Sequence, residues 1–419
     1  MEKTAQGTAQ CFIVIDDLLV YGSVISRPTG IQRVSAGIAN ALLASPHTFS
    51  VHVGSGEIRT AHLPKEGSIS WRSRPSEALL RLLSLAPRSL QEAIRTLART
   101  LLSRLASRRA GATVQPVAGD WLLVLGAPWI APGMANAVRA LAARHNLRVA
   151  LLVHDLLPAT DPQWFGDAQG VAARRDMETL IGTANLLFAV SNEVAHQVRK
   201  QTARLVHSVS PADPLFPRTA PRTAPRTALR TAAGSNEPII LTVGTLHPRK
   251  NLAALVRIWD QWIESSEQDR SAADGPPRLI IAGRRHPQDA ALFDALASHP
   301  RARSRISLVH TADDAQLAEL YATARFLVMP SLAEGWGMPV REALVAGIPS
   351  IVTDAVPAAQ STPYVKIVPA GDEGALSAAI HEWWDGVEPE RLSTEIRQHF
   401  TPRTWTDVAH EIEALLAKD

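Results

Sequence analysis

Short apolar runs alternate along the chain with segments whose apolar residues recur every three or four positions. Runs such as 12–15, 148–153 and 326–329 have the length of buried strands, and segments such as 134–145 have the length of helices. Continuous apolar runs are typical of parallel strands covered on both faces, and the wider spacing is typical of helices packed beside them. The pattern predicts an α/β fold built from doubly wound sheets.

The alternation occurs in both halves of the chain. In the first half, strands are expected at 12–15, 120–125, 148–153 and 185–190, and helices at 34–43 and 134–145. In the second half, strands are expected at 238–243, 278–282, 306–309 and 326–329, and helices at 252–264, 290–297, 316–325 and 407–417. A chain of 419 residues with 46% hydrophobic content is long enough for two separate cores.

A segment of different composition separates the two halves. Residues 217–236 contain a tandem Thr-Ala-Pro-Arg repeat that has no face to bury, and its prolines forbid a regular helix. We therefore predict a first domain over 1–216, a linker over 217–236 and a second domain over 237–400.

The net charge of +3 and the pI of about 9.2 come largely from a local excess of arginine. The predicted helical insert 72–110 has many arginines, and its acids are limited to Glu77 and Glu92. Within 76–109 the apolar face is expected to hold Leu90, Ile94, Leu97, Leu101 and Leu105, and the opposite face Arg88, Arg95 and Arg99. Such a helix either lies on an anionic membrane surface or packs on its domain with the arginines in solvent. Nucleic acid is disfavoured as a partner because interleaved aromatic residues for base stacking are absent.

The cysteine count and the first apolar run give information about the cellular compartment. Cys11 is the single cysteine, so the chain forms no internal disulfide and fits a reducing cytoplasm. The apolar run that starts there is far shorter than the roughly 18 residues of a membrane span. Asp16 and Asp17 follow it without the spacing of a metal-binding Asp-x-Asp element, so we interpret them as strand-end residues.

The segment 330–349 has the clearest features of a site. It follows the apolar run 326–329, turns on Gly335 and Gly337, and opens a helix with Pro339 in the first turn. The loop is thus expected at the carboxyl end of a strand, where α/β sheets bind ligands. Glu334 and Glu342 can there accept hydrogen bonds from sugar hydroxyls. An arbitrary glutamate pair is more often a solvated surface pair, but the glycines and the strand-loop-helix setting favour a site.

Two further segments carry candidate chemistry. Arg249 and Lys250 follow the Gly244 turn at a predicted helix start, which suits a diphosphate, although such a pair is by itself usually surface charge. His154 and Asp155 follow the strand 148–153 and are expected at its carboxyl edge. The first predicted strand is not followed by Gly-x-Gly-x-x-Gly, which argues against a dehydrogenase.

The run Glu-Gly-Trp-Gly-Met-Pro-Val-Arg-Glu-Ala, followed by Ala-Gly-Ile-Pro, resembles the donor-site signature of the retaining glycosyltransferases of family 4. The segment Gly-Thr-Leu-His-Pro-Arg-Lys-Asn is similar to that family's phosphate loop, with Thr245 where an arginine is frequent, and Pro-Thr-Gly-Ile-Gln-Arg is similar to its first glycine-rich loop. The resemblance implies the GT-B fold, in which two Rossmann-like domains face each other across a cleft, with the helix of 401–419 packing back on the first domain.

The resemblance also implies roles for single residues. It assigns catalysis to His154, Glu334, Arg249 and Lys250. It assigns the donor sugar to Glu334, Gly335, Trp336, Gly337, Met338 and His154. It assigns the nucleotide to Gly30, Gly244, Thr245, Arg249, Lys250, His310 and Glu342. The acceptor would contact Asp155 and Trp129, although a buried structural role is equally expected for the tryptophan.

The expected activity is that of a retaining, metal-independent glycosyltransferase with no cofactor and no metal ligand. By resemblance to O-antigen and exopolysaccharide transferases, the donor would be GDP-mannose or GDP-rhamnose and the acceptor a lipid-linked or growing surface polysaccharide. The location would be the cytoplasm, or the inner face of the cytoplasmic membrane. One alternative is a UDP-hexose-dependent transferase, and another is a noncatalytic protein of the same fold that binds nucleotide-sugars or membranes.

Overall fold

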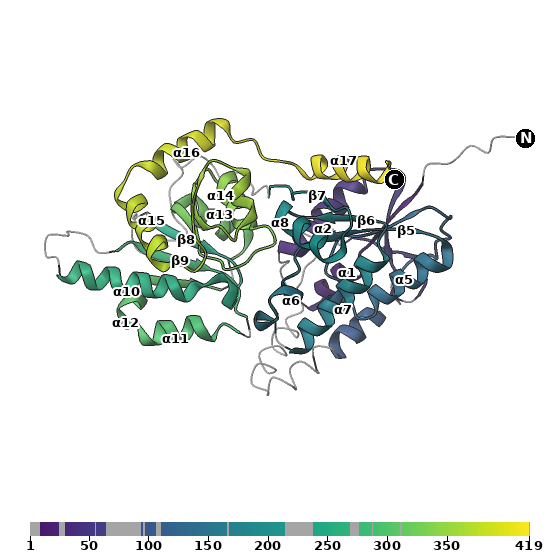
Figure 1. The fold of residues 1–419 in the computed structure, drawn as a ribbon, viewed down its shortest axis with the longest axis horizontal. Helices are drawn as coiled ribbons and strands as arrows, with labels where there is room; N and C mark the ends of the chain where they lie inside the picture. The colour runs from purple at the N-terminus through teal and green to yellow at the C-terminus, as the bar shows by residue number, and fades with distance from the viewer. Residues whose placement is uncertain are drawn as a thin grey trace, which may run out of the picture. The chain divides into compact units, whose positions relative to one another are not determined.

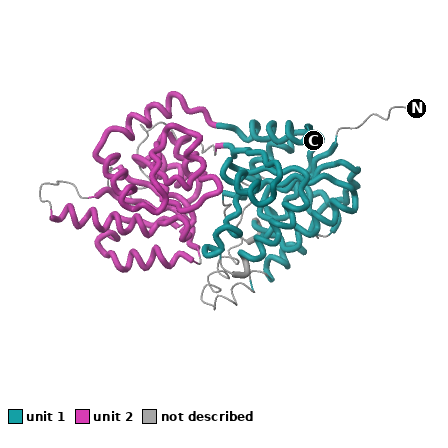
Figure 2. Tube along the Cα trace, in the orientation of Figure 1, with its two compact units in different colours: residues 1–212, 403–419 teal, residues 213–402 magenta. Residues whose placement is uncertain are grey.

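The computed structural model describes residues 9–24, 30–54, 56–63, 94, 97–105, 110–165, 167–213, 238–268, 276–286, 288–310 and 312–418. The chain divides into two compact units (Figures 1 and 2). Unit 1 comprises Met1–Ala212 and Arg403–Asp419, and unit 2 comprises Asp213–Pro402. The predicted linker and most of the predicted helix 76–109 lie outside the described residues.

Unit 1 contains a seven-stranded sheet with the order β3-β2-β1-β4-β5-β6-β7. All neighbouring strands are parallel except β2 and β3, which are antiparallel. The strands are β1 (Cys11–Val14), β2 (Thr48–His52), β3 (Arg59–Thr60), β4 (Trp121–Val124), β5 (Arg148–Val153), β6 (Leu186–Ala189) and β7 (His207–Ser208). β1, β4 and β6 are buried along their whole length, as continuous apolar runs require.

The helices of unit 1 follow its strands along the chain. They are α1 (Asp16–Val24), α2 (Gly30–Leu42), α5 (Met134–His145), α6 (Leu157–Thr160), α7 (Asp167–Thr183), α8 (Asn192–Thr202) and α17 (Trp405–Leu416), with 3-10 turns η1 (Pro128–Ile130) and η2 (Pro162–Trp164). The terminal α17 packs on α2, where a Cβ at Gly37 would lie only 2.4 Å from the Trp405 ring. Glycine at position 37 therefore permits this close contact.

Unit 2 contains a six-stranded parallel sheet with the order β10-β9-β8-β11-β12-β13. Its strands are β8 (Ile239–Val243), β9 (Arg278–Ala282), β10 (Ile306–Val309), β11 (Ala324–Met329), β12 (Ser350–Thr353) and β13 (Val365–Val368). Its helices are α10 (Leu252–Gln268), α11 (Ala290–Ser298), α12 (Pro300–Arg303), α13 (Asp314–Thr323), α14 (Met338–Val345), α15 (Glu373–Asp385) and α16 (Glu388–His399), with 3-10 turns η3 (Pro248–Lys250) and η4 (Pro357–Ser361). The largest core cluster of the unit surrounds the fully buried Trp259.

The bounds of several elements depart from the sequence prediction. Asp16 and Asp17 lie at the end of the first strand, as expected, and they also form the first turn of α1, which the sequence did not predict. Gly30 is the first residue of α2 and does not belong to a preceding loop. α13 starts at a capping box between Asp313 and Gln316, and it ends before Arg325, which belongs to β11.

Asp16 and Asp17 are almost fully buried at the carboxyl end of β1. Asp16 accepts hydrogen bonds from the backbone N–H groups of Val53 and Gly54 and lies 2.9 Å from His52 Nδ1. Asp17 accepts from the N–H of Ala127 at 3.0 Å. Burial raises the pKa of Asp17 to about 7, and the backbone bonds only partly oppose that rise.

We expect the stability of the protein to fall between pH 4 and pH 7 through Asp17. In that range the folded state holds a proton on Asp17 that the unfolded chain releases near pH 3.8, so raising the pH favours unfolding until the folded pKa of about 7 is passed. In the Asp17→Asn variant, stability measured by thermal denaturation should no longer fall with pH in this range through this residue. Asp161→Asn, at a half-exposed position of the same unit, serves as control. Equal slopes in the wild type and Asp17→Asn would contradict the assignment.

Candidate active site

The loop between β11 and α14 carries Glu334 and is shaped by a required glycine. Gly337 has a φ of +104°, and a Cβ there would lie 2.4 Å from Val356 Cγ1. Both facts exclude larger residues at this position. Pro339 lies in the first turn of α14, as expected. The Trp336 ring is half-buried against a small apolar cluster that includes Met329 and Val340, so part of its surface serves packing.

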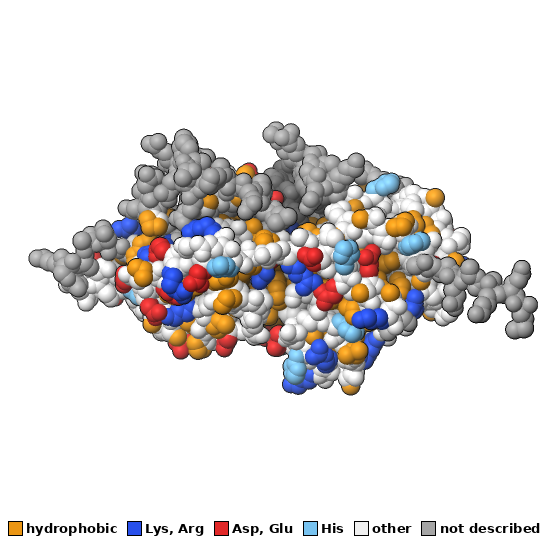
Figure 3. Space-filling model, turned by 90° about the horizontal axis from the view of Figure 1, so that it is seen from above, with side chains coloured by type: hydrophobic (Ala, Val, Ile, Leu, Met, Phe, Trp, Pro, Cys, Tyr) orange, Lys and Arg blue, Asp and Glu red, His pale blue; other side chains and the backbone are white. Residues whose placement is uncertain are grey.

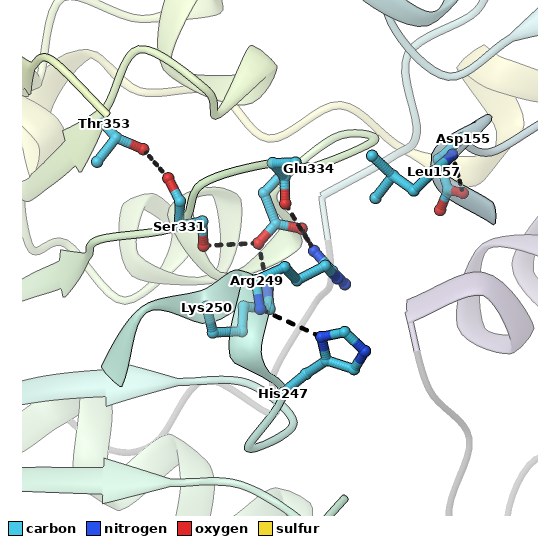
Figure 4. Close-up of polar contacts among 9 residues, drawn as sticks. Asp155, Leu157, His247, Arg249, Lys250, Ser331, Glu334 and Thr353 are labelled. Carbon is cyan, nitrogen blue, oxygen red and sulfur yellow. Dashed lines mark hydrogen bonds and ion pairs between the residues drawn. The ribbon is translucent and has the colours of Figure 1, made fainter. Parts of the chain in front are cut away.

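Glu334 is the centre of a buried ionic cluster (Figure 4). Its Oε2 atom lies 2.6 Å from Arg249 Nη1, and its Oε1 atom contacts Lys250 Nζ. Ser331 Oγ also donates to Oε1, at 2.8 Å. The Glu334 side chain is 6% exposed and that of Lys250 is 10% exposed. The structure thus brings together three of the four predicted catalytic residues, all within unit 2.

The pKa values of the cluster follow from burial and mutual attraction. Burial alone would raise the pKa of Glu334, but the charges of Arg249 and Lys250 outweigh it and lower that pKa to about 2. Burial lowers the pKa of Lys250, and the charge of Glu334 opposes that effect. The carboxylate is therefore ionised at neutral pH and serves as the counterion of two cations that a diphosphate would also attract.

The turn η3 holds the two cations in place. His247 Nδ1 accepts the N–H of Arg249 at 3.2 Å, and the His247 ring contacts the His286 ring in a tilted arrangement, with 4.4 Å between centroids. The carbonyl oxygen of Arg249 accepts the N–H of Leu332 at 2.7 Å, which ties η3 to the Glu334 loop. Sequence reasoning missed His247, although its place one residue before Pro248 at the start of a helical turn is a capping signal.

Gly244 and Thr245 belong to the turn that connects β8 with η3. A Cβ at the neighbouring Gly283 would lie 1.7 Å from the carbonyl oxygen of Gly244, so the ends of β8 and β9 approach each other too closely for any side chain at position 283. His310 lies just past β10, where its Nδ1 atom donates to the carbonyl of Gly283 at 3.3 Å. Gly244, Thr245 and His310 thus lie at the carboxyl edge of one sheet.

Glu342 and Arg341 occupy adjacent positions on α14 and have separate partners. Glu342 is 5% exposed, and its Oε2 atom accepts a hydrogen bond from the Tyr321 hydroxyl at 2.6 Å. Arg341 forms a two-pronged pair with Asp213, at 2.5 Å from Nε and 2.8 Å from Nη2. The guanidinium of Arg341 also lies 5.1 Å from the centroid of the Phe400 ring. Neither the Tyr321 nor the Asp213 contact has a signature in the sequence, because both partners are distant along the chain.

His154 is buried at the end of β5 in unit 1. Its Nε2 atom lies 2.7 Å from the carbonyl oxygen of Leu125, which can only accept, so Nε2 carries the hydrogen and Nδ1 is left as an acceptor. Burial lowers the pKa of His154 to about 4, and the bond to Leu125 opposes this only in part. The ring is neutral at physiological pH, so it can accept a hydroxyl hydrogen and does not supply positive charge.

Asp155 and Trp129 line one pocket of unit 1. Trp129 lies in η1, just after β4, and Asp155 follows β5, where its Oδ1 atom accepts the N–H of Leu157 at 3.2 Å. Arg174 of α7 also lines this pocket. The two predicted acceptor residues therefore share a cavity at the carboxyl edge of their sheet. Gly30, at the exposed start of α2, is the one predicted nucleotide residue that lies in unit 1.

Comparison with known proteins places these features in a family. Residues 237–385 match the model of the family described as Glycosyl transferases group 1. The serotype-specific mannosyltransferase WbdA of Escherichia coli is 28% identical over 222 residues, which cover 48% of this chain and 25% of WbdA. The O-antigen chain mannosyltransferase B of Escherichia coli is 28% identical over 169 residues, which cover 40% of this chain and 38% of that protein. The chain thus spans about a quarter of the length of WbdA.

A solved structure supports the fold of the whole chain. The crystal structure of Anabaena HepE in complex with UDP and glucose superimposes with a TM-score of 0.63 at 13% identity, covering 98% of this chain and 100% of HepE. The chain has the GT-B fold, and residues 237–385 belong to the glycosyl transferases group 1 family. It is homologous to the O-antigen mannosyltransferases of Escherichia coli named above. The predicted fold class is confirmed, and the predicted relation to glycosyl transferases of group 1 is confirmed for residues 237–385.

Proposed function

We propose that the protein is a retaining glycosyltransferase that moves mannose or a deoxyhexose from a GDP-sugar to a hydroxyl of a lipid-linked or growing surface polysaccharide. The observation that carries this proposal is the cluster of Glu334, Arg249 and Lys250 on the carboxyl edge of the unit 2 sheet. A buried lysine, a partly buried arginine and a carboxylate match a ligand with a diphosphate next to a sugar. The mannosyltransferase homologues support mannose as the transferred sugar.

Each residue has a distinct part in the proposed reaction. Arg249 and Lys250 stabilise the charge that develops on the leaving diphosphate, which makes a metal ion unnecessary for that purpose. Glu334 contacts the donor sugar together with the backbone of Gly335, Trp336, Gly337 and Met338, and Glu342 holds the ribose. The acceptor hydroxyl attacks the anomeric carbon from the side of the leaving group. The bond from that carbon to the phosphate oxygen breaks, and a phosphate oxygen receives the hydroxyl proton.

The residues of unit 1 serve the acceptor and the donor sugar in this proposal. His154 accepts a hydrogen bond from a donor hydroxyl at Nδ1, because its Nε2 hydrogen already bonds to Leu125. Asp155 and Trp129 contact the acceptor from their shared pocket, where a carboxylate and an indole ring suit the polar and apolar faces of a sugar.

A donor screen tests this function. The protein is incubated with GDP-mannose, GDP-rhamnose and UDP-glucose, and transfer or hydrolysis is followed by release of the nucleoside diphosphate. We expect turnover with a GDP-sugar and a product whose anomeric configuration, read by NMR, is that of the donor. An inverted product would refute the retaining mechanism.

UDP-hexose is the second candidate donor, favoured by the solved HepE complex with UDP and glucose. The same screen separates the two donors, because turnover with UDP-glucose and not with GDP-sugars would select it. Binding of nucleotide-sugars without turnover of any of them would favour the noncatalytic alternative.

We also propose that the protein works on the inner face of the cytoplasmic membrane. Three leucines on the helical stretch 97–105 are exposed, namely Leu97 by 60%, Leu101 by 49% and Leu105 by 46%. They lie four residues apart on one helical face, and Ser103 of the same stretch is buried. Exposed leucines argue against the alternative in which this face packs on the domain.

Charge favours an anionic lipid surface as the occupant of this leucine face. The surrounding sequence 72–110 is rich in arginine, and Arg104 is exposed on the described part. Elsewhere on the surface, acidic and basic side chains are interspersed over the face drawn in Figure 3. None of the described helices is long and apolar enough to span a bilayer.

The triple variant Leu97→Ser, Leu101→Ser, Leu105→Ser should bind anionic vesicles at least tenfold more weakly than the wild type, because each leucine contributes about 1.5–3 kcal/mol when buried. Co-sedimentation with vesicles containing phosphatidylglycerol measures this. Leu205→Ser is the control, since Leu205 is 73% exposed in the same unit and lies outside the basic segment. Equal binding by the triple variant and the control would rule out the leucine face as the membrane contact.

A further inference from the structure

Tyr321 is the fully buried residue of α13 that touches Glu342. Its side chain is 0% exposed, and its hydroxyl oxygen lies 2.6 Å from Glu342 Oε2 and 3.4 Å from the carbonyl oxygen of Pro339. A phenol has one hydrogen to donate. The Glu342 carboxylate is closer than the Pro339 carbonyl oxygen, and its charge makes it the stronger acceptor. The hydrogen therefore goes to Glu342, and the phenol fixes the direction of that carboxylate.

The orientation of the Glu342 carboxylate affects how a ligand would bind. Glu342 belongs to α14, the helix that directly follows the Glu334 loop. Burial lowers the pKa of Lys250, one of the two cations that the proposed diphosphate would contact, and the charge of the Glu342 carboxylate acts to raise that pKa. A carboxylate has two oxygens and about four lone-pair directions, and the phenol uses one of them at Oε2. A flexible glutamate side chain would lose rotamer freedom on binding a ligand, and a glutamate already held by Tyr321 loses less.

We propose that Tyr321 is a positioning residue that orients Glu342 toward the ribose hydroxyls of the nucleotide, and that it thereby sets the selectivity for ribonucleotides over deoxyribonucleotides. This inference rests on the proposed function, which assigns Glu342 to the ribose. Tyr321 itself belongs to the core of unit 2, in one cluster with Leu241, Leu327 and Ala343. It acts on the ligand only through the carboxylate.

The test compares ligands that differ by one hydroxyl. Calorimetry measures the binding of GDP, 2′-deoxy-GDP and 3′-deoxy-GDP, and of the matching uridine compounds, to the wild type and to Tyr321→Phe. The wild type should bind at least one deoxy compound about tenfold more weakly than its parent, which is the effect of one hydrogen bond to a charged group. In Tyr321→Phe that ratio should fall to about threefold or less, while affinity for the deoxy compound stays within about twofold of wild type.

Phenylalanine keeps the ring and removes only the hydroxyl, so the core packing of α13 is retained. The matched control is Tyr364→Phe, since Tyr364 belongs to the same unit and packs against the other large core cluster. Its ratio of affinities for the parent nucleotide and the deoxy compound should equal that of the wild type. Thermal denaturation of both variants reports any general loss of stability, which would weaken the parent and the deoxy compound equally and leave their ratio unchanged.

An unchanged ratio in Tyr321→Phe overturns the positioning role, and so does an equal loss of affinity for parent and deoxy compounds. A wild type that binds GDP or UDP without any preference for the ribose also overturns it. If the wild type binds neither GDP nor UDP, the proposed function is refuted together with the positioning role. If it binds one of them and only the ratio fails, the positioning role alone is refuted.

Discussion

Lys250→Gln is expected to reduce glycosyl transfer by about 10²–10³-fold, because a preorganised donor to a developing anion typically contributes that much. Lys250 is buried beside Glu334 and on the same turn as Arg249, so its charge is little screened by solvent. Glutamine keeps hydrogen-bonding capacity and removes the charge. The measurement is the turnover number with the donor that the screen identifies, at saturating acceptor.

The control for this variant is Lys366→Gln. Lys366 belongs to the same unit and also pairs with a glutamate, Glu382, but that pair lies at the surface. Exposed pairs contribute about 0–1 kcal/mol, so both turnover and stability should stay close to wild type. If Lys250→Gln retained more than a tenth of the wild-type turnover while still binding the donor, Lys250 would not stabilise the leaving group.

The second large effect is expected in Glu334→Gln, and it concerns stability as well as transfer. Glutamine keeps an acceptor for Ser331 but leaves Arg249 and Lys250 without their counterion. Breaking a buried pair costs about 3–5 kcal/mol, which corresponds to a fall of roughly 10 °C in the melting temperature. Transfer should fall together with stability, because the proposed contact with the donor sugar is lost.

A nucleoside diphosphate should reverse part of the stability loss in Glu334→Gln. The two cations then take the diphosphate in place of the carboxylate, so GDP or UDP should bind more tightly than to the wild type and raise the melting temperature by more. Differential scanning fluorimetry over a series of ligand concentrations measures both quantities. Glu382→Gln removes the surface glutamate and provides the control. A smaller ligand-induced shift in Glu334→Gln than in the wild type would show that the diphosphate does not use this cation pair.

The order of strands and helices could be predicted in large part from the sequence, because each element has a local signal. Helix α5 has the predicted bounds 134–145, and Pro339 marks the start of α14. The strands β2, β3, β7, β12 and β13 were not predicted. β13 is partly exposed and contains a lysine, so it lacks the continuous apolar run that signals a buried strand.

The candidate site was predictable as a set of residues but not as a set of contacts. Glu334, Arg249 and Lys250 could be selected because each follows a glycine-containing turn or stands beside one at the end of a strand. Their mutual ion pairs join positions 84 and 85 residues apart, and no local pattern encodes such a distance. The contact of Tyr321 with Glu342 could not be predicted for the same reason. A buried tyrosine on a helix has the same local sequence pattern whether or not its hydroxyl binds a carboxylate.

The partners of Arg341 have a mechanical consequence for unit 2. Asp213 is the first residue of this unit and Phe400 lies two residues before its end, so one guanidinium links the incoming and the outgoing segment of the polypeptide. The same side chain precedes Glu342 on α14. Any displacement of α14 would therefore act on both segments through the single side chain of Arg341.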